Sequence, residues 1–291
     1  MLPQGLSLGP FSFSGYGLMV MAGVVAGLWL LGQTAPKAGT TGKKAFDMAF
    51  YLIIAGIFGS RLAYVLFHLP HYAVNPISML KYWEGGLMFQ GGLLAGLLVA
   101  VILARLQHLN LLMMADAIAP GLALGQAFGR LGCLLAGCCY GFVAPDSFPF
   151  GQTFPFGSLA PAGRPLYPTQ AAESLGLFAI TAILLFLLQR KRPVGLVLGA
   201  YLALSGCLRF IVDQYRGDFR GPRTFGLVPT SWAALCIALS GLFLIVFLVV
   251  RQKRKAKSLL TQASAALPTL AQPAEVLAEE EEEPAEPVSN D

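Results

Sequence analysis

Seven apolar stretches, each close to the length that a helix needs to cross a bilayer, constrain the fold of this chain more than any other feature. They lie near residues 15–34, 47–68, 86–107, 112–140, 169–190, 194–213 and 227–250. The composition agrees, because 56% of the residues are hydrophobic and only 12% are charged, whereas about 25% are charged in typical soluble domains. The sequence therefore predicts an all-α polytopic membrane protein with about seven transmembrane helices.

The basic residues of the connecting loops predict how these helices are oriented. They lie after the first, third, fifth and seventh apolar segments, as Lys37, Lys43, Lys44, Arg105, Arg190, Lys191, Arg192, Arg251, Lys253, Arg254, Lys255 and Lys257. Lysine and arginine accumulate in short cytoplasmic loops. We therefore expect the N-terminus outside and the C-terminus in the cytoplasm. The fourth segment is long enough to be tilted, broken or partly re-entrant.

Three further regions follow from composition. The N-terminus lacks the positively charged region of a signal peptide, so we expect the first apolar segment to be retained as a helix. Residues 258–291 are rich in Ala, Pro and Glu and predict a disordered acidic cytoplasmic tail after a membrane domain of residues 1–257. Residues 141–168 are rich in Pro, Gly and Phe, which is typical of a loop in the outer interface, where it could cover a lipid entrance.

Polar side chains gather at one predicted level, in the outer half of the membrane. Three arginines lie late in outward-running segments, and other polar residues begin the inward-running ones; the set is Arg61, Arg130, Arg209, Tyr16, Gln90, Gln170 and Glu173. An arginine within a spanning helix costs at least about 2.5 kcal/mol unless something compensates it. One interpretation is that these arginines bind the phosphate of a lipid head group. The alternative is that they pair with Glu173, Asp213 or Asp218 and only hold helices together.

Three cysteines follow Arg130 in the fourth segment: Cys133, Cys138 and Cys139. Their spacing lacks the paired pattern of zinc sites, so we expect no metal. Their positions favour two other interpretations. The cysteines either act as small buried hydrophobic residues or form a disulfide near the outer surface.

Six motifs in order carry a resemblance to a known family. They are SGYG with Tyr16, GSRLAYVLF with Arg61, NPISMLKYWEGGLMFQGGLLAG from Asn75, GRLGCLLAGCCYG from Gly129, YPTQAAES from Tyr167 and LRFIVDQYRGDFRG from Leu208. In this order and on this seven-helix plan, the chain resembles the prolipoprotein diacylglyceryl transferases from about Gly9 to Val250.

The resemblance implies a reaction between two membrane-bound substrates. The thiol of the lipobox cysteine in a prolipoprotein signal peptide displaces glycerol phosphate from phosphatidylglycerol and forms a thioether with the diacylglyceryl group. No metal, soluble cofactor or nucleic acid takes part. The resemblance also implies a location in the bacterial inner membrane, among membrane lipid, with the active site facing the outer leaflet.

The resemblance assigns roles to individual residues. Arg130 matches the arginine of the family signature, Arg209 the essential arginine of the sixth helix, and Tyr16 the tyrosine of the first. We therefore hypothesise a catalytic set made of Arg130, Arg209, Gln90 and Tyr16. The predicted phosphatidylglycerol-binding set contains Arg130, Arg209, Arg61, Arg216, Glu173, Gln170 and Asp213.

The chain departs from the family at several positions. Gln90 stands where a histidine is usual, and a glutamine cannot act as a base. Cys133, Ala136 and Cys138 stand where Asn, Asn and Glu are common. The thiol proton could instead pass to Glu173, Asp213 or His68, or cationic surroundings could lower the pKa of the substrate thiol.

Two other function classes stay open at this point. One is a paralogue that binds or transports phospholipid without covalent chemistry, although the sequence shows no inverted repeats of the kind that transporters often have. The other is a structural membrane subunit, in which carboxylates would satisfy the arginines.

Overall fold

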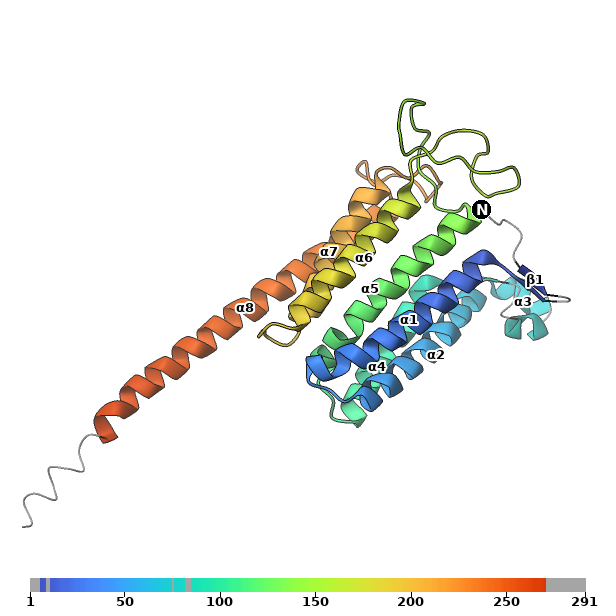
Figure 1. Ribbon diagram of the computed structural model, residues 1–291. Coiled ribbons are helices and arrows are strands. Elements are labelled where there is room, and N and C mark those ends of the chain that lie inside the picture. The colour runs from blue at the N-terminus through green and yellow to red at the C-terminus, as the bar shows by residue number, and fades with distance from the viewer. Residues whose placement is uncertain (1–5, 9–10, 75, 82–84, 271–291) are drawn as a thin grey trace, which may run out of the picture. The chain divides into compact units, whose positions relative to one another are not determined.

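The computed structural model describes residues 6–8, 11–74, 76–81 and 85–270, and helices dominate it (Figure 1). In chain order the elements are β1 (Leu6–Leu8), β2 (Phe11–Phe13), α1 (Gly15–Ala38), α2 (Gly42–Phe67), α3 (Leu69–Val74), η1 (Pro76–Leu80), α4 (Phe89–Leu106), α5 (Leu111–Ala136), α6 (Thr169–Leu188), α7 (Leu196–Asp213) and α8 (Pro229–Leu270). The strands β1 and β2 form a short antiparallel pair before the first helix.

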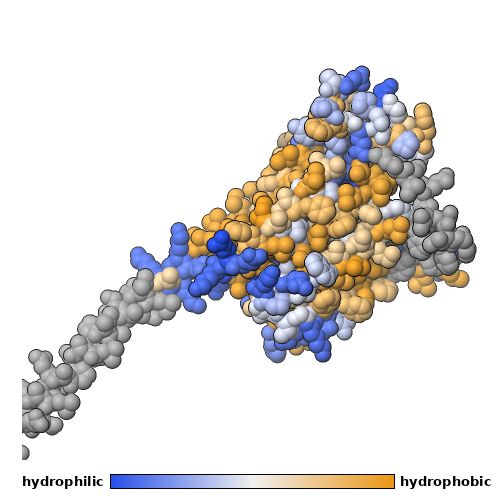
Figure 2. All heavy atoms as spheres, in the orientation of Figure 1, coloured by the Kyte–Doolittle hydropathy of each residue, from blue (hydrophilic) through white to orange (hydrophobic). Residues whose placement is uncertain are grey.

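Among the described residues, seven helices are long and apolar enough to cross a membrane: α1, α2, α4, α5, α6, α7 and residues Pro229–Ser258 of α8. This confirms the predicted multi-pass membrane protein. Apolar side chains cover most of the visible face of these helices in Figure 2, as a hydrocarbon environment requires. Of the readings proposed for the fourth segment, a broken helix does not occur, since α5 continues through Pro120 and ends at Ala136.

The last helix is longer than the sequence predicted. Helix α8 extends to Leu270, so residues 258–270 are helical rather than the beginning of a disordered tail. This stretch contains Leu, Gln and Ala, which are good helix formers and can extend a helix that the membrane segment has already nucleated. The rest of the predicted tail, residues 271–291, lies outside the described residues. The chain divides into compact units of residues 1–245 and 246–291.

Helix α5 is the centre of the larger unit and packs mainly against α1 and α6. Glycines bring the backbones of α1 and α5 into contact. A β-carbon placed on Gly27 would lie 2.9 Å from the carbonyl oxygen of Gly121, and one on Gly121 would lie 2.7 Å from the carbonyl oxygen of Gly27. Side chains are excluded at this crossing, as in other close helix pairs in membranes. The contact fixes the start of α1 beside the end of α5.

Helices α2 and α4 form a second close pair, also built on glycines. A β-carbon on Gly91 would lie 2.2 Å from that of Ala63 and 2.5 Å from the carbonyl oxygen of Gly59. We therefore expect Gly91→Ala to lower the free energy of unfolding by about 1–3 kcal/mol through overpacking. Thermal unfolding in detergent measures this. Gly96→Ala on the same helix is the control, because its β-carbon would meet open space; equal melting temperatures for the two variants would contradict the packing argument.

Candidate functional site

Three helices bring two arginines to one buried carboxylate. Glu173, in the first turns of α6, is only 5% exposed. Its Oε2 lies 3.1 Å from Nε of Arg130 in α5, and its Oε1 lies 3.1 Å from Nη1 of Arg209 in α7. The structure therefore places these three predicted site residues together at one end of the bundle.

A second carboxylate holds Arg209 from the other side. The Oδ1 atom of Asp213 lies 3.2 Å from Nε of Arg209 and 2.9 Å from Nη1 of Arg220. The Thr230 hydroxyl donates a hydrogen bond of 2.7 Å to Oδ2 of Asp213. The sequence analysis gave no role to Arg220 or Thr230, because nothing in their local pattern indicates which helix end they meet.

Arg216 has a partner of its own. Its guanidinium donates two hydrogen bonds to Asp218, of 2.9 Å from Nε and 2.6 Å from Nη2. This bidentate pair leaves Arg216 less able to bind a ligand directly than Arg130 or Arg209. Its predicted role in lipid binding stays a prediction.

The charges of this cluster do not balance. The arginines are Arg130, Arg209, Arg216 and Arg220, and the carboxylates paired with them are Glu173, Asp213 and Asp218. One positive charge is therefore left over within this set. The side chains of Arg130 and Arg209 are 21% and 24% exposed. Among the described residues, neither Nη atom of Arg130 nor Nη2 of Arg209 has a hydrogen-bond partner. These donors suit an anion with a single negative charge.

Gln170 is almost fully buried, at 1% exposure, and acts on the backbone. Its Nε2 donates a hydrogen bond of 2.9 Å to the carbonyl of Cys138, and the neighbouring Thr169 hydroxyl donates one of 3.0 Å to the carbonyl of Cys139. In this structure Gln170 therefore holds the loop after α5, and its predicted contact with lipid stays untested.

Tyr16, Gln90 and Arg61 lie on other elements. The ring of Tyr16 lies against Gly132 in α5, close to Arg130 in sequence, and its side chain is partly exposed. Gln90, at the start of α4, is exposed. Arg61 is buried and donates hydrogen bonds to the carbonyls of Ser78, Met79, Gly85 and Gly86. These bonds indicate that Arg61 positions the segment before α4, whereas the sequence analysis placed it with the lipid phosphate.

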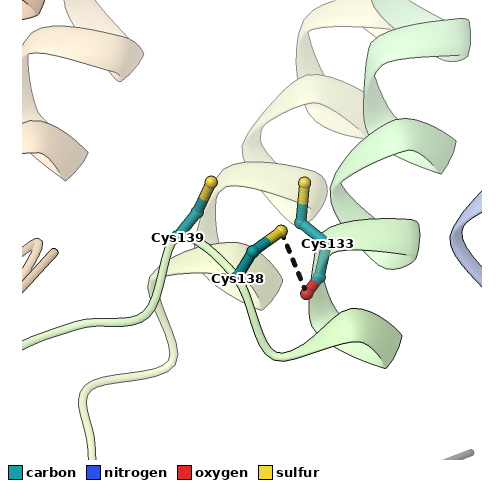
Figure 3. Close-up of side chains that lie close together, drawn as sticks. All are labelled: Cys133, Cys138 and Cys139. Atoms are coloured by element: carbon teal, nitrogen blue, oxygen red, sulfur yellow. Dashed lines mark hydrogen bonds between the residues drawn. The ribbon is translucent and has the colours of Figure 1, made fainter. Parts of the chain in front are cut away.

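The three cysteines meet at the end of α5, as Figure 3 shows. The Sγ atoms of Cys133, Cys138 and Cys139 all lie within 4.8 Å of one another, and all three residues are free thiols. Gly137 ends the helix in the left-handed conformation at φ 72°, and Cys139 adopts φ 62°, which is uncommon for a residue other than glycine. The loop therefore doubles back and brings together cysteines that the sequence spaces irregularly.

Electrostatic effects distinguish the two loop cysteines. Hydrogen bonds from the thiols of Cys133 and Cys138 lower the pKa of the Cys139 thiol, and the charges of Arg216 and Arg130 lower it further against the opposing effect of burial. The pKa of Cys138 is raised, mainly because its thiol is hydrogen bonded to Cys133 and Cys139. Cys139 is thus the member of the cluster that most readily becomes a thiolate.

An apolar pocket of about 380 Å³ lies between α1, α2 and α5. Its lining residues include Val20 and Gln126. Val20 follows Tyr16 by four positions and Gln126 precedes Arg130 by four, which is about one helical turn or roughly 6 Å along each helix. Val24 and Leu122, also in the lining, are exposed on the outer surface of the helices. The pocket is apolar and large enough to hold hydrocarbon, and it begins about one helical turn from Arg130.

Known proteins are similar in sequence to this chain over most of its length. The sequence model of the prolipoprotein diacylglyceryl transferase family matches residues 3–249. A phosphatidylglycerol–prolipoprotein diacylglyceryl transferase 2 of Clostridium perfringens is 34% identical over 79% of this chain and 88% of its own length. The phosphatidylglycerol–prolipoprotein diacylglyceryl transferases of Cupriavidus pinatubonensis and Bordetella avium are each 34% identical over 87% of this chain, and over 93% and 97% of their own lengths. The chain therefore belongs to the prolipoprotein diacylglyceryl transferase family.

Proposed function

We propose that this chain transfers the diacylglyceryl group of phosphatidylglycerol to the lipobox cysteine of prolipoproteins and releases glycerol phosphate. The observation that carries the proposal is the arrangement of Arg130 and Arg209, which share Glu173 and keep three Nη atoms without a partner among the described residues. A phosphodiester carries one negative charge and accepts hydrogen bonds from guanidinium groups in a bidentate way. Its single negative charge matches the one positive charge that the arginines of this cluster have in excess of the carboxylates.

In the reaction, the sulfur of the substrate cysteine forms a bond to the glyceryl carbon as the bond from that carbon to the phosphate oxygen breaks. Negative charge then increases on the departing phosphate. Donors that are already in place stabilise such charge without reorganisation during the step. Glu173 and Asp213 hold Arg130 and Arg209 in this geometry.

The apolar pocket beside this cluster would hold an acyl chain. It begins one turn below Tyr16 and Arg130, and exposed side chains such as Val24 and Leu122 give it contact with surrounding lipid. A lipid with its phosphate at Arg130 could therefore extend its tail along α1 and α5. In this proposal the polar cluster faces the outer leaflet of the bacterial inner membrane, as the basic loops predict.

The test uses purified protein in phosphatidylglycerol micelles with a lipobox peptide, and measures glycerol phosphate release. Release that requires both the peptide thiol and Arg209 supports the transferase. Saturable binding of phosphatidylglycerol without release, with every lipobox peptide tried, would instead support the alternative of a lipid-binding or transporting paralogue.

Gln90 is expected to position a substrate by hydrogen bonding rather than to move a proton. We therefore expect Gln90→Ala to lower the rate by about tenfold, the effect of losing one neutral hydrogen bond. The same release assay measures this. A loss of 1000-fold or more would contradict the assignment, because it would indicate a role in the proton transfer itself.

The C-terminal region is expected to be dispensable for the chemistry. Deleting the chain after Lys257 removes no member of the Arg130, Glu173 and Arg209 cluster. We expect the truncated enzyme to release glycerol phosphate at the rate of the full chain, measured at equal amounts of folded protein. An inactive truncation that is folded would show that the tail takes part.

A further inference from the structure

The cysteine cluster has the geometry of a ligand site rather than of three separate thiols. The sulfur atoms of Cys133, Cys138 and Cys139 lie within 4.8 Å of one another. Around a zinc ion, with bonds of about 2.3 Å, thiolate sulfurs are roughly 3.8 Å apart. A small inward movement of side chains would close the three sulfurs around one ion.

Buried polar side chains fix the backbone of this cluster. Gln170 and Thr169 of α6 bind the carbonyls of Cys138 and Cys139, and both residues are buried. The next carbonyl along the chain, that of Tyr140, accepts a hydrogen bond of 2.9 Å from the amide of Gly217. Neighbouring segments thus hold the loop in a conformation that includes the uncommon left-handed Cys139. A site that is preorganised loses little entropy when it binds an ion.

The cluster also lies next to the proposed reaction centre. Cys133 follows Arg130 by three residues, so the two side chains lie on the same face of α5. Arg216 lies beside the same loop, where its backbone forms a bridge with that of Gly141. Cys138 and Cys139 are partly exposed, which leaves one side of the cluster accessible.

We propose that Cys133, Cys138 and Cys139 bind one thiophilic divalent cation of the Zn²⁺ class, and that its fourth coordination position takes the thiol of the substrate cysteine. Zinc sites with three protein ligands commonly keep a fourth position for water or substrate. A thiol that coordinates such an ion loses its proton. The role in substrate activation rests on the proposed function; the metal site itself does not.

The chemistry of this step balances without any further reactant. The substrate thiol releases its proton to solvent as its sulfur binds the ion. That sulfur then forms the thioether bond to the glyceryl carbon, and the bonding electrons of the broken carbon–oxygen bond leave with glycerol phosphate. The neutral thioether is a weaker ligand than the thiolate and dissociates, and the ion is unchanged. This supplies the thiol activation that Gln90 cannot provide as a base.

The inference differs from the sequence-based expectation of no metal. That expectation depended on the family resemblance and on the irregular spacing of the cysteines, and the spacing says nothing about the turn that follows Gly137. The sulfur atoms converge because the chain reverses at the end of α5.

The first experiment measures metal binding without reference to activity. Full-length protein, purified in detergent with a reductant and stripped by a chelator, is loaded with Zn²⁺ and analysed for bound metal. The expected result is a single ion per chain, and at least 100-fold weaker binding in Cys138→Ser and Cys139→Ser. The matched control is the Cys207→Ser, Cys236→Ser double variant, which removes the exposed cysteines of α7 and α8 and should bind as the wild type does.

Two outcomes would overturn the metal site. One is the absence of bound Zn²⁺ in protein whose thiols are shown to be reduced, and the other is unchanged binding in the Cys138→Ser variant. Binding of Co²⁺ tests cysteine ligation by absorption spectroscopy, with Cys133, Cys138 and Cys139 all unchanged. Co²⁺ added to the Cys207→Ser, Cys236→Ser protein should produce thiolate-to-metal charge-transfer absorption, and a spectrum without it would count against cysteine ligation.

The second experiment tests the fourth position. A lipobox peptide with cysteine is added to the Co²⁺ protein, and the same peptide with serine is the control. The cysteine peptide alone should change the ligand-field bands of the ion; equal spectra would overturn substrate coordination. Chelation should lower glycerol phosphate release by about 100-fold, as expected when thiol activation is lost, and Zn²⁺ should restore it. If metal and peptide thiol bind but no release occurs under any condition, the proposed function fails while the metal site stands.

Discussion

Replacing Arg130 with alanine is expected to lower the rate of glycerol phosphate release by about 100-fold to 1000-fold. The reason is that Arg130 directs Nη donors without a partner among the described residues toward the proposed phosphate position, and Glu173 holds only its Nε. Losing one preorganised donor to developing negative charge typically costs this much. The measurement is the release assay with saturating lipobox peptide.

Two further variants test whether the effect is specific to the guanidinium of Arg130. Arg130→Lys keeps the charge but loses the planar fork, so we expect it to recover only part of the rate. Arg190→Ala is the matched control, because Arg190 is exposed after α6 and its guanidinium lies over the ring of Phe186. Arg190→Ala should keep the wild-type rate. An Arg130→Ala enzyme as active as Arg190→Ala would exclude Arg130 from phosphate binding.

Replacing Glu173 with alanine is expected to lower the free energy of unfolding by about 3 kcal/mol and to reduce activity with it. The variant leaves Arg130 and Arg209 side by side without the carboxylate that they share, and removal of one partner from a buried ion pair is strongly destabilising. A bound phosphodiester would restore one negative charge at the same place. Phosphatidylglycerol should therefore raise the melting temperature of this variant more than that of the wild type.

Asp116 at the opposite end of α5 supplies the control. It is as buried as Glu173, pairs with Arg192 at 2.5 Å and accepts hydrogen bonds from the amides of Gly195 and Leu198. Asp116→Ala should also destabilise the protein, but phosphatidylglycerol should give it no extra protection. Equal protection of both variants would mean that the lipid stabilises the bundle in general and does not replace the charge of Glu173.

The sequence predicts the helices well because each one must be long and apolar to cross a bilayer. The grouping of Arg130, Arg209 and Glu173 follows from their shared level in the membrane together with the family resemblance. Other partners depend on the conformation of loops. Arg61 reaches carbonyls of the segment before α4, and no periodicity in the sequence encodes that choice.

The loop after α5 is the clearest example of what the sequence could not predict. The meeting of its cysteines depends on left-handed backbone at Gly137 and Cys139, and Cys139 is a residue type that rarely adopts it. Gln170 turns toward this loop and holds its backbone. Residues 258–270 are helical although the sequence predicts a disordered tail there, because composition does not show where a long helix ends.

The glycine crossing of α1 and α5 has a consequence for how the enzyme responds to membranes of different thickness. Helices adapt to a thinner or thicker hydrocarbon layer chiefly by changing their tilt. The backbone contact between Gly27 and Gly121 makes these two helices tilt as one body, without sliding past each other. Tyr16 and Arg130 therefore keep their spacing across bilayers whose lipids differ in chain length.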